Sequence, residues 1–367
     1  MNNSEIKKVL VFRPGSLGDT IVALPALWSL REQLRSSKIT HLYNIDRRNQ
    51  HYITPRDVLD GSGLVDEWFE YPLFDGQSRV SRALSRVRLF LNLRRSRFDA
   101  VVYLMPRERT LKQIDRDVAF FKAAGIGKFF GVDHLRKNRF ELFDRPAAVR
   151  VDNESTFLLH CLEGDGFAPV YSENQDWLKI SKSERSAIDA IRASQFPEAA
   201  CRTLLAVSPG SRRPSRMWNE DRFLDVVKRL VTEKNVFPIL FGSTAEIDLC
   251  ERIKHNVGGG FNAAGKLSVR ESAALLKICR LYLGNDTGTM HLAAAVGTPC
   301  VALFSAADRD GQWEPFGYGH KFFRRNVECA GCRIEICPRA NLCLELIAPN
   351  DVFDACIEAI GNEGTFV

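Results

Sequence analysis

Short apolar runs alternate along the chain with longer segments in which apolar residues recur every three or four positions. The runs have the length of single strands, and the segments between them have the spacing of amphipathic helices. The expected strands are Lys8–Arg13, Ile39–Ile45, Asp99–Met105, Thr203–Ser208, Phe237–Phe241, Leu281–Asn285 and Cys300–Phe304. This alternation predicts an α/β fold of parallel sheets covered by helices on both faces.

The alternation is interrupted near the middle of the chain. Residues 163–184, EGDGFAPVYSENQDWLKISKSE, are rich in Gly, acidic and polar residues and predict a linker. We therefore expect two doubly wound, Rossmann-like domains that meet at a cleft, over residues 1–175 and 176–348, with a final helix and tail over 349–367. Ligands of such sheets bind beyond the carboxyl ends of the strands, so the loops there are the places to look for function.

Composition narrows the class of protein only slightly. The chain has 367 residues, of which 45% are hydrophobic and 26% charged, as in ordinary globular proteins of two domains. No apolar run is long enough to span a membrane, and the start MNNSEIKKVL lacks the apolar segment of a signal peptide, so we expect a cytoplasmic protein. The net charge of +6 fits a phosphorylated partner, nucleic acid or an anionic membrane without choosing among them.

The first expected strand leads into a glycine-bearing loop. Residues 9–30 read VLVFRPGSLGDTIVALPALWSL, which predicts a strand, a loop and a helix. Phosphate-binding sites are built in this order, but the spacing of Gly15 and Gly18 is not that of a dinucleotide-binding loop. Asp19 stands where the helix begins, and it is either a plain helix cap or a functional carboxylate.

The most informative segment is LYLGNDTGTMHLAAAVGTPCVALFS, residues 281–305. Residues 286–289 are expected at a helix N-terminus, where backbone N–H groups and the helix dipole favour a diphosphate. Gly288 permits close approach of the backbone, while Thr287 and His291 offer further donors. The plain alternative is a cap by Asp286 or Thr287 with a histidine that only packs the helix.

Several separated motifs resemble those of the lipopolysaccharide heptosyltransferases, a family of inverting glycosyltransferases (family 9) with the two-domain GT-B fold. AGKLS, NDTGTMH and GTPCVALF resemble the family's AGK-(T/L)-S, NDTG-x-MH and GTP-x-VALF stretches. SPGSRRPSRMWNEDRF resembles its PG-x-x-x-x-x-K-x-W segment, SAADRDGQWEPFG its TDP-x-x-W-x-P-x-G segment, and the opening loop its (K/R)-x-x-x-LGD motif. The motifs follow the family's order along most of the chain.

The resemblance implies transfer of a sugar, a heptose from ADP-heptose, to an acceptor hydroxyl with inversion, in lipopolysaccharide core or a related cell-surface glycan. Asp19 is then the base that takes the hydroxyl proton, and Gly15, Ser16 and Gly18 lie beside the acceptor. Arg216 replaces the family's lysine at the leaving diphosphate, which keeps the charge but changes its reach. The residues expected at the donor are Ser208, Gly210, Ser211, Arg216, Glu246, Lys266, Asp286, Thr287, Gly288 and His291.

Two of these donor residues have plainer explanations. Glu246 follows the strand Phe237–Phe241 and can accept hydrogen bonds from ribose hydroxyls, or it is a surface glutamate. Lys266 can meet the nucleotide or the phosphates, and we rank it below residues 286–288. Arg212 and Arg213 share the loop of Arg216, and either can assist it or stay solvated.

We expect no catalytic metal and no cofactor for transfer, because a helix N-terminus and arginines can stabilise the leaving diphosphate. The chain has two Asp-x-Asp pairs, which in other glycosyltransferases bind metal. Asp115 and Asp117 flank an apolar helical stripe, so the spacing predicts a solvated face. Asp308 and Asp310 fall inside the segment that resembles TDP-x-x-W.

Residues 78–97, SRVSRALSRVRLFLNLRRSR, predict a basic amphipathic helix on the acceptor side. The segment has seven arginines and no acid, and its apolar positions recur at helical spacing. It fits the anionic inner leaflet of a membrane or the phosphates of a lipid-linked glycan acceptor, or else it is a packed helix with a solvated basic face. Arg107 and Arg109 follow the strand ending at Met105 and are candidates for an anionic acceptor.

The ten cysteines fall into two groups. Six lie among apolar neighbours and are expected in the core: Cys161, Cys201, Cys250, Cys279, Cys300 and Cys356. The others, Cys329, Cys332, Cys337 and Cys343, have the spacing C-x₂-C-x₄-C-x₅-C and predict a structural zinc or iron site, with free or partly disulfide-bonded thiols as the alternative. A protein-modifying branch of the resembled family ligates iron through cysteines.

Other classes of protein fit less of the chain. A basic zinc-finger protein would use the charge and the four cysteines, but it would leave the other motifs unexplained, so we expect no nucleic-acid partner. Glycosyl transfer to a protein acceptor and a non-catalytic relative that only binds sugar nucleotides stay open. The presence of both Asp19 and the Asp-Thr-Gly loop disfavours the latter.

Overall fold

A computed structural model of the chain describes residues 6–46, 48–49, 52–72, 78–139, 149–170 and 176–361. It divides into two compact units: the first is Met1–Arg145 with Glu154–Tyr171, and the second is Pro146–Asn153 with Ser172–Val367. The boundary expected at residue 175 falls among residues 171–175, which lie outside the described residues. The chain therefore enters the second unit briefly, over the segment 149–153, before it returns to the first.

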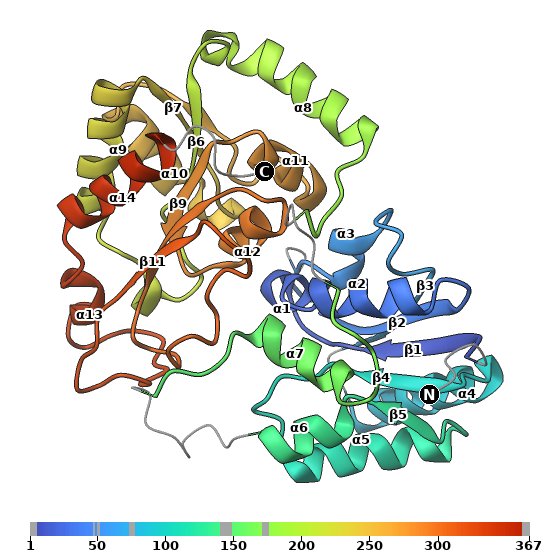
Figure 1. The fold of residues 1–367 in the computed structure, drawn as a ribbon. Coiled ribbons are helices and arrows are strands. Elements are labelled where there is room, and N and C mark those ends of the chain that lie inside the picture. The colour runs from blue at the N-terminus through green and yellow to red at the C-terminus, as the bar shows by residue number, and fades with distance from the viewer. Residues whose placement is uncertain are drawn as a thin grey trace. The chain divides into compact units, whose positions relative to one another are not determined.

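The first unit is built on a five-stranded sheet in the order β3-β2-β1-β4-β5, and every paired neighbour in it is parallel (Figure 1). β1 is central because its apolar run is covered on both faces. The strands are β1 (Lys8–Phe12), β2 (Lys38–Ile45), β3 (Glu67–Pro72), β4 (Ala100–Tyr103) and β5 (Lys128–Phe130). The helices are α1 (Leu17–Ile21), α2 (Leu24–Gln33), α3 (Pro55–Leu59), α4 (Arg79–Ser96), α5 (Leu111–Ala123), α6 (Val132–Asn138) and α7 (Glu154–Glu163).

The second unit has a six-stranded parallel sheet in the order β11-β10-β9-β6-β7-β8. Its strands are β6 (Thr203–Ser208), β7 (Val236–Leu240), β8 (Phe261–Asn262), β9 (Leu281–Asn285), β10 (Cys300–Phe304) and β11 (Lys321–Arg324). Its α-helices are α8 (Lys182–Gln195), α9 (Glu220–Lys234), α10 (Ile247–Asn256), α11 (Val269–Lys277), α12 (Gly288–Ala295), α13 (Leu342–Glu345) and α14 (Pro349–Gly361). Three short 3₁₀ turns are η2 (Pro197–Ala199), η3 (Pro214–Arg216) and η4 (Thr244–Glu246).

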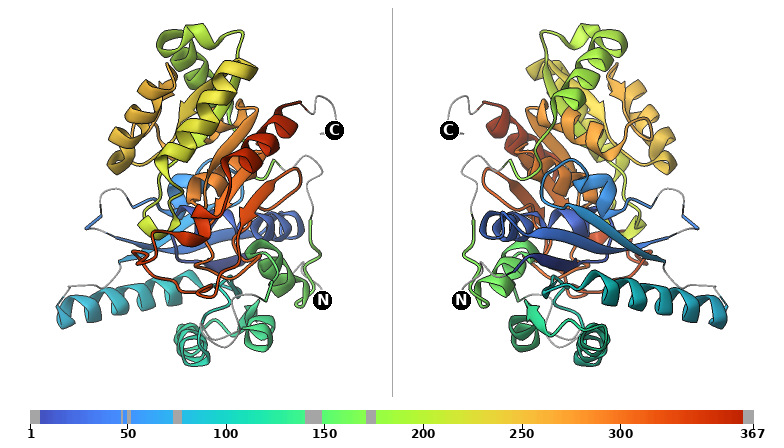
Figure 2. Two further views of the ribbon diagram at one scale, coloured as in Figure 1. Left: turned by 90° about the vertical axis from the view of Figure 1, so that its left-hand side faces the viewer. Right: turned by 90° about the vertical axis from the view of Figure 1, so that its right-hand side faces the viewer.

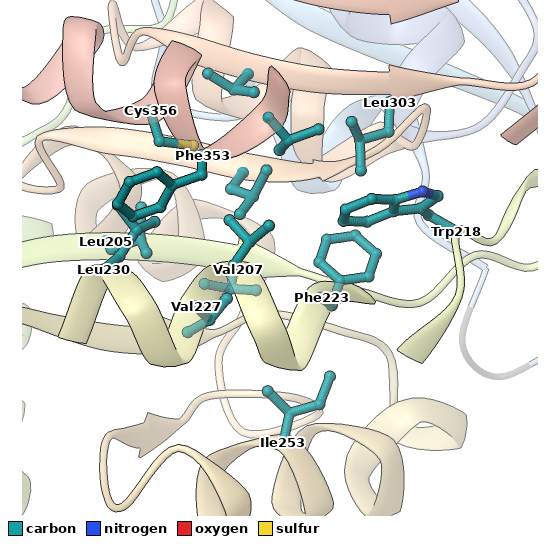
Figure 3. Close-up of a cluster of buried hydrophobic side chains, with 14 of the residues drawn as sticks. Leu205, Val207, Trp218, Phe223, Val227, Leu230, Ile253, Leu303, Phe353 and Cys356 are labelled. Atoms are coloured by element: carbon teal, nitrogen blue, oxygen red, sulfur yellow. The ribbon is translucent and has the colours of Figure 1, made fainter. Parts of the chain in front are cut away.

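The core of the second unit lies between its sheet and helices α9, α10 and α14 (Figure 3). Trp218 is 2% exposed, and its ring centroid lies 5.0 Å from that of Phe223 at the start of α9. Burial of a large apolar side chain contributes about 1.5 to 3 kcal/mol, so this pair holds the chain firmly just after η3. The core therefore fixes the loop that carries Arg216.

The predicted α/β fold class is confirmed, and each expected strand is present with ends shifted by at most two residues. β3, β5, β8 and β11 were not expected, because they are short or lack a continuous apolar run. Five of the six cysteines assigned to the core are buried, but Cys201 is exposed, so that assignment is wrong for Cys201. None of the described helices is long and apolar enough to cross a membrane.

Candidate functional site

The opening loop of the first unit is built on a buried arginine. Arg13, directly after β1, is 1% exposed, and its Nε donates a hydrogen bond to the backbone oxygen of Asp19 at 3.0 Å. Its Nη1 donates to the backbone oxygen of Leu104, after β4, at 2.9 Å. The guanidinium thus ties the start of α1 to the carboxyl ends of two adjacent strands.

Asp19 closes the turn that begins α1. Its Oδ2 accepts hydrogen bonds from the Ser16 backbone N at 3.0 Å and the Ser16 hydroxyl at 3.3 Å, while its Oδ1 lies 3.8 Å from Nη2 of Arg13. The side chain is 35% exposed. One oxygen therefore caps the helix, and the carboxylate stays accessible, as a base that meets a substrate must be.

Gly15 is required for this geometry. Its φ is +142°, and a Cβ at this position would lie 2.3 Å from Cβ of Asp19. The Gly15 backbone N donates to Oδ1 of Asn44, after the centre of β2, at 2.8 Å. The loop thus folds tightly onto the carboxylate, and Gly18 lies inside α1.

The arginines expected at an anionic acceptor both have partners inside the first unit. Arg107 is 4% exposed and pairs with the fully buried Glu154 at 3.1 Å, and its guanidinium stacks over the ring of Phe157. Arg109 pairs with Asp117 and donates to the Tyr103 hydroxyl. These contacts account for both arginines as structural residues, and an acceptor role for them stays a prediction.

The solvated face expected for the first Asp-x-Asp pair holds for only one of its acids. Asp115 is exposed and pairs with Arg136. Asp117 is 8% exposed and accepts a hydrogen bond from the Tyr103 hydroxyl at 2.9 Å, in addition to its pair with Arg109. The prediction is wrong for Asp117, because Tyr103 and Arg109 stabilise its charge inside the unit.

In the second unit, Arg216 lies between two carboxylates. Its Nη1 donates to Oδ2 of Asp286 at 3.1 Å, and its Nη2 donates to Asp308. The three residues come from η3, from the loop after β9 and from the loop after β10, all at the carboxyl edge of the sheet. Sequence reasoning placed Asp308 in a motif but gave it no role at the site.

Asp286 is the perturbed acid of this group. It is 6% exposed, and burial raises its pKa from 3.8 to about 6, helped by the nearby charge of Asp308 and opposed by Arg216 and Arg213. One guanidinium thus faces two carboxylates, of which Asp286 is the easier to protonate. Asp286 and Asp308 also line a small cavity with Arg309 and Trp313.

Helix α12 begins immediately after Asp286. Thr287 is the N-cap in extended conformation, and its side chain makes no capping hydrogen bond. Gly288 is the first residue of the helix, and His291, in the next turn, is 5% exposed with its ring 6.4 Å from that of Trp313. The first-turn N–H groups of α12 therefore lie beside Asp286 and are suited to an anion.

Glu246 meets the loop after β6. Its Oε1 lies against Gly210, where an added Cβ would be 2.0 Å away. Its Oε2 accepts from the Ser243 backbone N at 2.6 Å and the Ser243 hydroxyl at 2.8 Å, which closes η4. The structure brings Glu246 to Gly210 and fixes its orientation.

The remaining donor residues lie on neighbouring loops. Ser208 ends β6 and is 3% exposed. Ser211, two residues past Pro209, accepts from the backbone N of Arg213 at 3.3 Å. Lys266 is exposed after β8, and its Nζ lies 5.4 Å from the Phe261 ring centroid.

Sequence reasoning missed the residue that holds these loops together. Asn285, which is fully buried, donates from Nδ2 to the backbone oxygen of Pro209 at 2.7 Å, and its Oδ1 accepts from the backbone N of Trp218 at 3.0 Å. The end of β9 is thereby fixed to the loops on both sides of Arg216. A buried Asn at a strand end, directly before Asp286, was the available signal.

The cysteine loop packs against the same loops. Cys329, Cys332, Cys337 and Cys343 line one small cavity together with Ser215 and Ala306. All four are free thiols, and among the described residues no group of three or more His, Cys, Asp or Glu is arranged to hold a metal ion. The side-chain positions give the expected zinc or iron no support.

What the cysteine loop does in the structure is hold η3. Asn341 donates from Nδ2 to the backbone oxygens of Pro214 at 2.9 Å and Met217 at 3.0 Å. The hydroxyl of Ser215 donates to the backbone oxygen of Ile334 at 2.6 Å. Arg216 is therefore held from both sides by residues far along the chain.

Comparison with known proteins agrees with this picture. Residues 165–342 match the family model described as glycosyltransferase family 9 (heptosyltransferase). The chain is 24% identical over 321 residues to lipopolysaccharide heptosyltransferase 2 of Escherichia coli, which covers 83% of this chain and 84% of that protein. It is 21% identical to lipooligosaccharide heptosyltransferase 2 of Campylobacter jejuni, over 97% of this chain and 99% of that one.

Solved structures show the same fold. A family 9 glycosyltransferase from Veillonella parvula has a TM-score of 0.73 at 17% identity and covers 97% of this chain and 98% of its own. The ADP-heptose heptosyltransferase II of Escherichia coli has a TM-score of 0.67 at 19% identity, over 97% and 99%.

The fold and the matched domain define a glycosyltransferase with the GT-B fold. More narrowly, residues 165–342 form a glycosyltransferase family 9 domain, the heptosyltransferase family that the motifs resemble, so the chain is a sugar-transferring enzyme of heptosyltransferase type. The family resemblance and the GT-B fold are thus confirmed.

Proposed function

We propose that the protein transfers a heptose from ADP-heptose to an acceptor hydroxyl with inversion, in the assembly of lipopolysaccharide core or a related surface glycan. The observation that carries the proposal is the group formed by Arg216, Asp286 and the start of α12. Relatives named lipopolysaccharide heptosyltransferase match most of the chain, and one heptosyltransferase of the same fold, with a TM-score of 0.63, was solved with ADP-2-deoxy-2-fluoro heptose.

The second unit binds the donor in this proposal. The first-turn N–H groups of α12, with the Gly288 backbone exposed to close approach, take the diphosphate. Arg216 supplies positive charge as the bond from the anomeric carbon to the diphosphate oxygen breaks. Glu246 accepts hydrogen bonds from the ribose, because its carboxylate lies at the carboxyl end of β7 against Gly210.

The first unit supplies the base. The acceptor oxygen attacks the anomeric carbon from the face opposite the diphosphate, its proton passes to the Asp19 carboxylate, and ADP leaves with the bonding electron pair. One displacement of this kind inverts the anomeric centre. The accessible carboxylate of Asp19, held by Ser16 and Arg13, supports this assignment. No step in this route requires a metal.

Thermal unfolding with a panel of nucleotides tests donor binding. Ligands that bind the folded state raise the midpoint temperature, so ADP and ADP-sugars are expected to raise it while UDP and GDP do less. The acceptor is tested by transfer to heptose-deficient lipopolysaccharide and, separately, to a protein acceptor. Absence of any response to adenine nucleotides would overturn the proposal.

A further inference from the structure

Helix α4 leaves its apolar stripe uncovered. Val80, Leu84, Val87 and Leu91 are 68%, 65%, 55% and 41% exposed. At about 100° per residue these four positions fall within an arc of about 60° on the helix surface. Apolar residues that are exposed singly are ordinary, whereas a row of four on one helix marks an interaction surface. We call these four residues the α4 stripe.

The rest of α4 is firmly placed. Leu93 is fully buried, and the ring of Phe90 packs on that of Phe120, on α5, with centroids 6.0 Å apart. The helix starts at a regular cap, where the Ser78 hydroxyl accepts from the Ser81 backbone N at 3.1 Å. Figure 2 shows the helix reaching beyond the other elements of its unit. The exposure of the stripe is therefore a property of a well-anchored helix.

Positive charge flanks the α4 stripe. Residues 78–97 contain seven arginines and no carboxylate. By helical position Arg88 and Arg95 lie on one side of the stripe and Arg94 on the other, and all three side chains are exposed. Within the described part of the chain no carboxylate pairs with any of these three. The surface thus combines an apolar row with unneutralised charge on both sides.

We propose that the α4 stripe lies on an anionic lipid bilayer, with its apolar side chains among the acyl chains and the flanking arginines at the headgroups. An interfacial helix has this arrangement of an apolar face bordered by basic residues. A second copy of the chain fits less well, because paired stripes would bring two rows of arginines together. Nucleic acid would use the arginines but not four exposed aliphatic side chains.

Flotation of the full chain with lipid vesicles tests the proposal. Vesicles of phosphatidylglycerol and phosphatidylethanolamine are expected to bind the protein at least about tenfold more tightly than phosphatidylcholine vesicles, and less tightly as salt rises. The double variant Leu84→Ser/Val87→Ser is expected to lose about tenfold or more in affinity through its apolar contacts, and Arg88→Glu/Arg95→Glu through its charge. Both pairs are exposed, so folding is retained, and this is checked by the unfolding midpoint.

A matched control is Lys182→Glu/Arg185→Glu on the exposed face of α8, which changes charge equally and is expected to bind vesicles like the unmodified protein. Equal binding to both vesicle types, or undiminished binding by the Leu84→Ser/Val87→Ser variant, would overturn the proposal. So would a dimer, or a complex with RNA, that the same variant abolishes. Vesicle binding is measured without nucleotide, so it is separate from the donor assignment.

Discussion

Arg216 Nη1 lies 3.1 Å from Asp286 Oδ2, and the same guanidinium also donates to Asp308. The cation that the motif assigns to the leaving diphosphate is therefore already shared between two acids. Asp286 is 6% exposed and the Asp308 side chain 15%, so water screens this group weakly. Donor binding must accordingly depend on all three residues rather than on Arg216 alone.

Replacing Arg216 tests this dependence. Arg216→Gln leaves Asp286 and Asp308 facing each other without a cation, so unfolding is expected to become easier by about 3 kcal/mol, and affinity for an ADP-sugar to fall about 100-fold. Arg216→Lys restores the charge but not the two-sided fork, and is expected to lose about tenfold. Calorimetry and chemical denaturation measure both effects.

Arg212→Gln is the matched control, because it removes an exposed arginine from the same loop. It is expected to leave stability and affinity within a factor of about two. Equal losses in the Arg212 and Arg216 variants would show that the loop contributes only general positive charge.

The pKa of Asp286 gives donor binding a pH dependence. Burial raises this pKa to about 6, and a bound diphosphate adds negative charge that raises it further, so binding takes up a proton. Affinity for an ADP-sugar, whose diphosphate does not titrate in this range, is expected to rise up to about tenfold from pH 8 to pH 6. In Asp286→Asn this pH dependence is expected to vanish.

The same pKa predicts the effect of that variant on stability. Because the folded-state pKa exceeds the unfolded value of 3.8, the stabilising contribution is complete below that value and is lost as the pH rises through about 6. Asp286→Asn should therefore be more stable than the unmodified protein at pH 7.5, by up to about 3 kcal/mol, and equally stable near pH 3.5. Denaturant titrations at several pH values check this, and a less stable variant at pH 7.5 would contradict it.

Asn341 is expected to position Arg216 through the backbone of η3. Asn341→Asp keeps the left-handed backbone, with φ of 56°, but cannot donate to the oxygens of Pro214 and Met217. The KM for donor is expected to rise about tenfold with a smaller change in kcat, because the lost bonds are worth about 1 to 3 kcal/mol. Asn256→Asp, which loses a surface hydrogen bond on α10, should change neither constant.

His41 predicts acid sensitivity of the first unit. Its ring is fully buried on β2, and both ring nitrogens lack a hydrogen-bond partner. Burial, with the charge of Arg13, lowers its pKa from 6.5 to about 3. The unfolded chain therefore binds the proton more readily, and stability falls as the pH drops from 6.5 towards 3.

Replacing the imidazole should remove this term. His41→Leu is expected to be more stable at pH 7 by about 1 to 2 kcal/mol, because no unpaired polar nitrogen stays buried, and to lose less stability on acidification. An unchanged slope of unfolding free energy against pH between 6 and 4 would show that other groups govern acid unfolding.

The sequence predicted the central strands because their apolar runs are continuous and covered on both faces, as in β1 and β9. It failed for β3, whose residues are only partly buried, and for β5, which has three residues. At the site, the loop from Asp286 to His291 was identified from local order alone. The pairing of Arg216 with Asp308, 92 residues away, depends on the neighbouring places of β9 and β10 in the sheet, which no local pattern encodes.

Helical spacing likewise predicted α4 with its apolar stripe and basic face. It could not decide whether another element of the unit covers the stripe, because that depends on where the helix crosses the sheet edge. The same limit applies to Arg107, whose partner Glu154 is 47 residues away.

The most direct test of the account is the rate of heptosyl transfer by Asp19→Asn. The amide still accepts hydrogen bonds from Ser16 but cannot take a proton, so kcat is expected to fall by about 10²- to 10⁴-fold while affinity for ADP-heptose is unchanged. Asp57→Asn is the matched control, because Asp57 closes the same type of cap with Thr54 at the start of α3. Full transfer by Asp19→Asn, or an equal loss in Asp57→Asn, would contradict the assignment of Asp19 as the base.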